Sequence, residues 1–192
     1  MSAAADFDPV AETPKRPRAR LTGAVYLLYF LTAVSAALLA GRTSVVYSNA
    51  VNLVSTAFYI ALTLLFYYLF KPVSVRLSLL AAIVSLVGCA LLALGLFHLV
   101  PSHSSLFFFG FYCLLIGCLI FESGFLPRTL GVLMALAGLG WLTFLSPLGP
   151  RLTMYIEVLG VVAEAALMLW LLIFGVNLRR WTERATAADR YS

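Results

Sequence analysis

Hydrophobic residues are gathered in six long runs that charged residues hardly interrupt. An α-helix needs about 20 apolar residues to cross about 30 Å of hydrocarbon, and the runs reach that length. They do not alternate polar and apolar residues as the strands of a membrane barrel do. The pattern therefore predicts six transmembrane helices, over residues 21–40, 51–70, 77–100, 104–121, 126–146 and 152–177.

The composition supports a membrane protein, because 62% of the residues are hydrophobic and only 11% are charged. The mean hydropathy is +1.00, well above that of a soluble domain. We expect an all-α, polytopic transmembrane bundle of six helices over residues 21–177. A disordered basic leader over residues 1–20 is expected before it, and a basic tail over residues 178–192 after it. The end of that tail, from Glu183, is also expected to be disordered.

Basic residues predict the orientation, because Lys and Arg in short loops are retained on the cytoplasmic side. With six helices, both termini share one side with the second and fourth connectors. Only Arg42 and Arg151, of the 13 basic residues, then lie on the other side. Both termini are therefore predicted to be cytoplasmic. Topology and attraction to anionic lipid explain the net charge of +5, so we expect no nucleic-acid partner.

Signatures of catalysis or metal binding are not evident. Cys89, Cys113 and Cys118 lie inside predicted helices without the spacing of a zinc or haem site, so they are interpreted as small core residues. The chain has neither an H-E-x-x-H nor a G-x-S-x-G motif. The sequence therefore predicts no catalytic residue, metal site or cofactor, and an enzyme is not the favoured class.

Small residues recur at spacings that let helices approach closely in lipid. We expect them to pack the bundle. They are Gly131, Ala135 and Gly138 in the fifth predicted helix, Gly88 and Gly95 in the third, and Gly110 and Gly117 in the fourth.

Two carboxylates interrupt the last apolar run, in the stretch YIEVLGVVAEAALMLWLL from Tyr155. Glu164 is expected near the middle of its helix, with Glu157 about 10 Å closer to the outer surface. Seven residues are nearly two turns, so both side chains are expected on one face, about 20° apart. Because a charge at mid-bilayer costs roughly 3 kcal/mol, this face should turn into the bundle.

Glu164 has two interpretations. It is either a protonatable or cation-binding group in a cavity, as in a protein that binds or moves a small ligand or ion, or a glutamate that only ties helices together in a structural or regulatory subunit. Glu157 has a plainer explanation as an interfacial residue paired with Arg151 or His98.

Polar residues near the predicted outer helix ends indicate either an outward-facing vestibule or ordinary interfacial polarity. Asn52 and His98 are the ligand candidates among them. A metal site of His98, His103 and Glu157, or a membrane-embedded enzyme, is the third alternative, although Pro101 separates the two histidines. The whole set is Arg42, Asn49, Asn52, His98, His103, Arg151 and Tyr155.

Five strings carry a family resemblance: RLTGAVYLLYFLTAV, FYIALTLLFYYLFKPV, FFFGFYCLLIGCLIF, FLPRTLGVLMALAGLGWL and LWLLIFGVN. They resemble segments of DUF4386, a family of bacterial membrane proteins with a domain of unknown function. The resemblance covers about residues 20 to 177. It implies six helices in a bacterial cytoplasmic membrane and no catalytic residues to carry over. This chain differs in its short PSHSS connector, and in Asn52, where several members have an aspartate.

Overall fold

The computed structural model describes residues 17–39, 41–101 and 104–189. Within these ranges the chain is helical and contains no strand. The elements are α1 (Ala19–Leu39), α2 (Val45–Phe70), α3 (Val75–Leu96), α4 (Ser104–Ser123), α5 (Arg128–Leu142), the short 3₁₀ helix η1 (Thr143–Leu145), α6 (Gly149–Ile173) and α7 (Leu178–Asp189).

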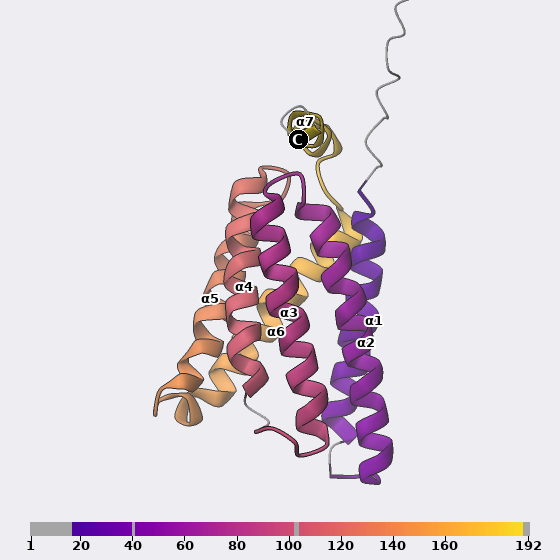
Figure 1. Cartoon of the computed structure of the whole chain (residues 1–192), viewed down its shortest axis with the longest axis vertical. Helices are drawn as coiled ribbons and strands as arrows, with labels where there is room; N and C mark the ends of the chain where they lie inside the picture. The colour runs from indigo at the N-terminus through magenta and orange to yellow at the C-terminus, as the bar shows by residue number, and fades with distance from the viewer. Residues whose placement is uncertain (1–16, 40, 102–103, 190–192) are drawn as a thin grey trace, which may run out of the picture.

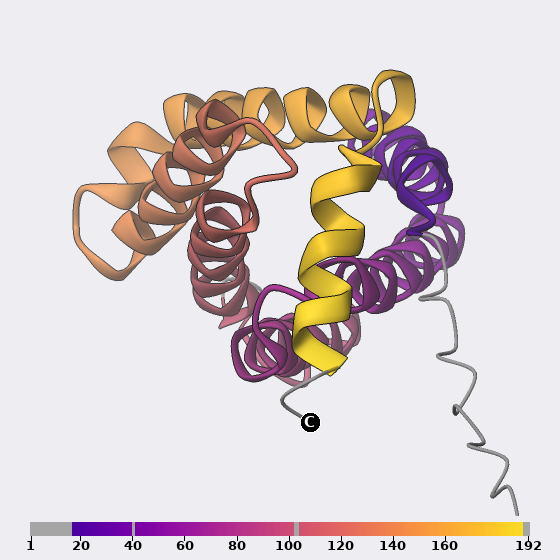
Figure 2. The same cartoon turned by 90° about the horizontal axis from the view of Figure 1, so that it is seen from above.

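The first six helices stand side by side in a closed ring (Figures 1 and 2). Each packs against its neighbours in the sequence, and α6 returns to α1 to complete the ring. The short connectors make neighbouring helices antiparallel. We call the end where α1 begins the α7 end, because α7 lies across it (Figure 2), and the opposite end the far end.

All six ring helices are long and apolar enough to cross a membrane. This confirms the predicted architecture and identifies a multi-pass membrane protein. The main difference is that α2 begins at Val45, six residues before the predicted start. Large apolar side chains such as Leu31, Leu64, Leu79 and Val162 are exposed on the ring, as contact with lipid requires.

Helix ends follow the local sequence. Ser44 and Ser74 are the N-cap residues of α2 and α3, and each hydroxyl accepts a hydrogen bond from a backbone N–H three residues later. Gly124 and Gly175 follow α4 and α6 with φ of 69°, the left-handed conformation that glycine adopts most readily. These two glycines turn the chain sharply at the α7 end.

Helices α4 and α5 approach most closely through their small residues. A Cβ atom built on Gly117 would lie 2.9 Å from the Gly131 carbonyl oxygen, and one on Gly138 would lie 2.7 Å from the Gly110 oxygen. No side chain fits there without separating the helices. The expected packing role of these four glycines is confirmed.

The C-terminal tail is not disordered where the structure describes it. Leu178–Asp189 form α7, so the expectation of disorder from Glu183 is wrong as far as Asp189. The leader residues 1–16 lie outside the described residues. Trp181 and Ala185 are buried against the ring, and the Trp181 indole N–H donates to the Leu69 carbonyl at 3.0 Å. An apolar stripe therefore fixes a helix that is otherwise polar.

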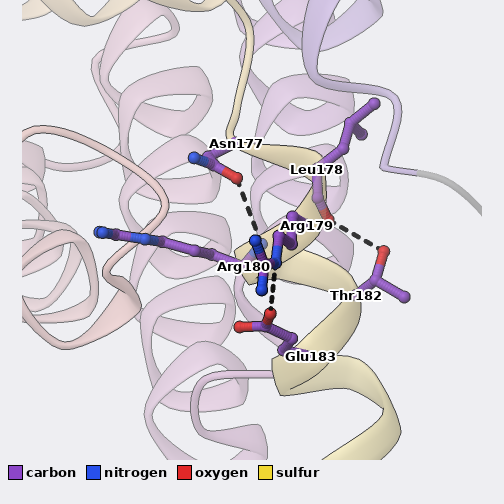
Figure 3. Close-up of polar contacts among 6 residues, drawn as sticks. All are labelled: Asn177, Leu178, Arg179, Arg180, Thr182 and Glu183. Carbon is purple, nitrogen blue, oxygen red and sulfur yellow. Dashed lines mark hydrogen bonds and ion pairs between the residues drawn. The ribbon is translucent and has the colours of Figure 1, made fainter.

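Arginines of α7 bind the C-terminal end of α4. Arg180 donates to the Gly124 carbonyl at 2.8 Å and Arg184 to the Glu122 carbonyl at 2.9 Å. The last carbonyls of a helix lack partners within it and carry partial negative charge, so cations are favourable there. The first turn of α7 is held by Asn177, whose side chain accepts from the Arg180 backbone N–H (Figure 3). Helix α7 thus ties together the ends of α2 and α4.

Candidate functional site

Glu164 lies near the middle of α6, half-buried, on the side that faces into the ring. Gly160 of α6 packs against Trp141 of α5, whereas Leu172 packs against Gly23 of α1. At 3.6 residues per turn, Glu164 projects between these two contact directions. The interior of the ring lies in that direction, as expected from the sequence.

Tyrosines from three other helices lie in the neighbourhood of this carboxyl group. Tyr26 and Tyr29 of α1, Tyr59 of α2 and Tyr112 of α4 all lie close enough for an electrostatic interaction with Glu164. The Tyr26 hydroxyl is in hydrogen-bonding reach of the carboxyl group. The ring centroids of Tyr29 and Tyr59 are 4.8 Å apart, and those of Tyr59 and Tyr112 are 6.0 Å apart. We call these five residues the Glu164 cluster.

The Glu164 cluster lies at mid-depth in the ring. Tyr29 is the central residue of α1, and Tyr59, Tyr112 and Glu164 are within a turn of the midpoints of their helices. The six ring helices carry Lys or Arg only within their first three residues, at Arg20, Arg76, Arg128 and Arg151. Among the described residues, an ionised Glu164 therefore has no cationic side chain at its own depth.

One hydroxyl group of the cluster is left unpaired. The Tyr112 side chain is 3% exposed, and its hydroxyl has no hydrogen-bond partner among the described residues. Thr63 lies beside it, but the Thr63 hydroxyl donates to the Tyr59 carbonyl at 2.9 Å and lies 2.7 Å from the Ser85 hydroxyl. Since Thr63 has one proton to give, Ser85 is the donor of that second bond. The Thr63 oxygen keeps a second lone pair that can accept from the Tyr112 O–H, whereas the acceptor lone pairs of the Tyr112 oxygen are free.

Exposure changes steadily along the α6 stripe that faces α1. Glu157 is exposed, Val161 is 51% exposed, Glu164 is half-buried and Met168 is 5% exposed. Figure 2 shows that α6 crosses one side of the ring obliquely, so that it lies beside α5 at its start and beside α1 near its end. This oblique path explains why the exposure of the stripe falls along α6. Glu164 therefore lies between the exposed and the buried part of this stripe.

The other candidate residues lie nearer the far end. Asn52 is half-buried, and its amide donates to the Ser48 carbonyl of its own helix at 2.9 Å. His98 is exposed and follows α3 with φ of 58°. The expected pairing of Glu157 with Arg151 or His98 is wrong, since neither ion pair forms among the described side chains. The structure gathers tyrosines, and not these residues, around Glu164.

A metal site of His98, His103 and Glu157 finds no support in the described residues. They contain no group of three His, Cys, Asp or Glu side chains that could hold a metal ion. His103 itself lies outside the described residues. Cys89 and Cys113 are buried and Cys118 is exposed, all as free thiols.

Sequence reasoning missed the tyrosines, which belong to the apolar runs by composition. A signal was available, because a buried tyrosine hydroxyl needs a polar partner. Tyr26 and Tyr29, three residues apart, lie on one side of their helix, and Tyr59 and Tyr112 lie near the middles of theirs. Which of them meet Glu164 depends on how the ring closes.

A separate pocket of about 360 Å³ lies at the α7 end. The connectors that follow α4 and α6 line it, together with Trp170 and Arg180. Its residues include none of the Glu164 cluster.

The ring of six spanning helices and its polar centre define the class, a multi-pass membrane protein with an ionisable group inside the bundle. The family model described as a domain of unknown function (DUF4386) matches residues 101–175. The chain belongs to this family. It is similar to an uncharacterized protein of Archaeoglobus fulgidus, with 30% identity in an alignment 122 positions long that covers 58% of this chain and 74% of the relative. No solved structure matches the chain.

Proposed function

We propose that the protein binds a small ligand or ion inside the helix ring, with Glu164 as the binding group. The observation that carries this proposal is a half-buried carboxyl group at mid-depth, near four tyrosines and with no cationic side chain at its level in the part of the chain that the structure describes. Ionisable residues in a membrane interior are costly and mark ligand or ion pathways by default. The unpaired Tyr112 hydroxyl supports the proposal, because a ligand would supply its missing partner.

A structural or regulatory subunit is the second candidate. Its support is the Tyr26 hydroxyl, which places a polar group of the first ring helix near the carboxyl group of the last one. A hydrogen bond between membrane helices stabilises them by about 0.6–2 kcal/mol. In this case Glu164 contributes to stability alone.

The two candidates differ in what Glu164→Gln does. The protein is placed in lipid nanodiscs, and its melting temperature is measured with sodium chloride, potassium chloride or benzylammonium chloride at equal ionic strength. If the binding proposal is right, at least one cation raises the melting temperature of the wild type above its value in the other salts. The melting temperature of Glu164→Gln should be the same in all three salts. Glu157→Gln, the exposed carboxylate on the same stripe, is the matched control and should respond like the wild type.

The outcome that contradicts binding is equally specific. If every cation shifts the wild type and Glu164→Gln by the same amount, the carboxyl group has no role in recognition. A melting temperature lowered in Glu164→Gln without any ligand dependence then favours the structural subunit.

We also propose that the protein lies in a bacterial cytoplasmic membrane with its α7 end toward the cytoplasm. Arg179, Arg180 and Arg184 are exposed at that end. Basic side chains beside a spanning helix attract anionic lipid by about 1 kcal/mol each. Anionic headgroups are therefore the expected neighbours of α7.

A further inference from the structure

The charge of the Glu164 cluster restricts the ligand. One carboxyl group faces the interior at a depth where the ring helices have no Lys or Arg. A ligand with one positive charge neutralises it, whereas an anion is repelled and a neutral molecule leaves a desolvated charge uncompensated.

The walls of the cluster are aromatic. The Tyr59 ring is tilted at 61° to Tyr29, at 67° to Tyr112 and at 80° to Phe109, with centroid separations between 4.8 and 6.0 Å. Tilted pairs of this kind place the edge of one ring against the face of another. Aromatic faces attract cations within about 6 Å, by about 2 kcal/mol where water is excluded.

A multivalent metal ion is a poor fit to these groups. Ca²⁺ takes about 6 to 8 oxygen ligands and Mg²⁺ about 6 in near-octahedral geometry. The described residues hold no group of three acidic, histidine or cysteine side chains that could bind a metal. An organic ammonium needs fewer oxygens, because apolar contacts satisfy most of its surface.

The stripe beside Glu164 supplies such contacts. Val161 is 51% exposed where α6 leaves α1, and Met168 is buried on the other side of Glu164. An apolar body held next to Val161 would cover this exposed side chain. The Tyr112 hydroxyl, buried and unpaired, would accept an N–H of the ammonium group.

We infer that the ligand is a monovalent organic ammonium ion with an apolar body, whose charged end contacts Glu164 and the tyrosines and whose body lies along the α1–α6 stripe at Val161. This inference rests on the proposed function and names the ligand class of the same site.

Benzylammonium tests the inference, with benzyl alcohol as a neutral probe of similar size. Binding to the protein in nanodiscs is measured by isothermal titration calorimetry. Benzylammonium should bind the wild type and benzyl alcohol should not. Glu164→Gln should weaken binding about 10- to 100-fold, the worth of a charge-assisted hydrogen bond. Glu157→Gln should bind like the wild type.

Two variants of Tyr29 test whether the aromatic ring contributes to binding. They also test the inference if Glu164→Gln does not fold. Tyr29→Phe keeps the ring and should bind benzylammonium as the wild type does. Tyr29→Leu removes the ring and should bind about fivefold more weakly or worse. Equal affinities of the two variants would overturn the aromatic part of the inference.

The position of the apolar body is tested at two neighbouring valines of similar exposure, Val161 at 51% and Val162 at 50%. Val161 belongs to the stripe that faces α1, and Val162 lies on the other side of α6. Val161→Trp should lower the affinity for benzylammonium about tenfold or more, and Val162→Trp should not change it. Equal effects would contradict the placement.

The remaining outcomes separate the inference from the proposed function. If sodium or potassium binds in a Glu164-dependent manner and benzylammonium does not, the ligand class is wrong and the site stands. If no probe distinguishes the wild type from a folded Glu164→Gln protein, both fail.

Discussion

Tyr26 and Tyr112 of the Glu164 cluster are both buried, but their hydroxyl groups differ in whether a polar partner is nearby. The Tyr26 hydroxyl has the Glu164 carboxyl group within reach, whereas the Tyr112 hydroxyl has no partner among the described residues. A buried polar group without a partner costs about 1–3 kcal/mol, and a satisfied one contributes about 1 kcal/mol. The two hydroxyls should therefore affect stability with opposite sign.

Removing each hydroxyl tests this difference. Tyr112→Phe should raise the free energy of unfolding by about 1 kcal/mol, because it deletes an unpaired polar atom. Tyr26→Phe should lower it by about 1 kcal/mol, because Glu164 loses its hydrogen-bonding neighbour. Both are measured without ligand, by unfolding in a denaturing detergent. A loss of stability in Tyr112→Phe would mean that its hydroxyl is paired after all. In the presence of benzylammonium, Tyr112→Phe should bind more weakly despite its greater stability.

At the scale of single residues, the sequence predicted one of the five members of the Glu164 cluster, the glutamate itself. Glu164 was found because a carboxylate in an apolar run has a large desolvation cost wherever the run folds. Asn52 and His98 were chosen for polarity alone, and they lie nearer the far end. The tyrosines were missed because a phenol fits an apolar run, and only the packing of α1, α2 and α4 around α6 shows which of them have a polar neighbour.

Among the helices, α4 and α5 depend most on small residues. The glycine pairs at their contact leave no room for a side chain. Helix association in lipid relies on van der Waals contact and is not driven by hydrophobicity, so contacting helices need small residues. The regular spacing of these glycines in the sequence was therefore enough to predict the contact.

Two glycines of α5, two residues apart, test the contact. A Cβ atom at Gly138 would lie 2.7 Å from a backbone oxygen of α4, whereas one at Gly140 would meet nothing closer than 3.4 Å. Gly138→Ala should destabilise the protein by about 1–3 kcal/mol through overpacking. Gly140→Ala should be neutral or stabilising by up to about 1 kcal/mol, because alanine is the better helix former. Melting temperatures in detergent give the comparison, and equal effects would show that α4 and α5 are not in close contact.

Helix α7 shows where a pattern was overlooked. Leu178, Trp181, Ala185 and Ala188 recur at intervals of three and four residues, the period of an amphipathic helix. The surrounding charges suggested a disordered tail. Burial of Trp181 against the ring and the hydrogen bonds of Arg180 and Arg184 stabilise the helix, and these depend on the ends of α2 and α4 being nearby.

The orientation of the whole molecule depends on its charged connectors. Apart from Arg42 and Arg151, the basic residues belong to the α7 end or to the two termini. Since Lys and Arg in short loops are retained in the cytoplasm, we expect the α7 end there.

Cysteine labelling tests the orientation. Thr186→Cys places a thiol on exposed α7, and Leu148→Cys places one in the exposed connector at the far end. In intact cells a membrane-impermeant maleimide should label Leu148→Cys and not Thr186→Cys, and permeabilised cells should show labelling of both. The unmodified chain, with Cys89, Cys113 and Cys118, gives the background. The reverse pattern would invert the topology.

The sequence by itself determined the number of spanning helices, the small-residue contacts and the presence of one costly carboxylate at mid-depth. These depend on local length, spacing and desolvation, which any folded arrangement must respect. Only the tertiary structure decided that the helices close into a ring with α6 crossing obliquely from α5 to α1. It likewise decided that four tyrosines gather at Glu164 and that α7 covers one end. Those features depend on contacts between residues far apart in the chain, for which a hydrophobic pattern contains no information.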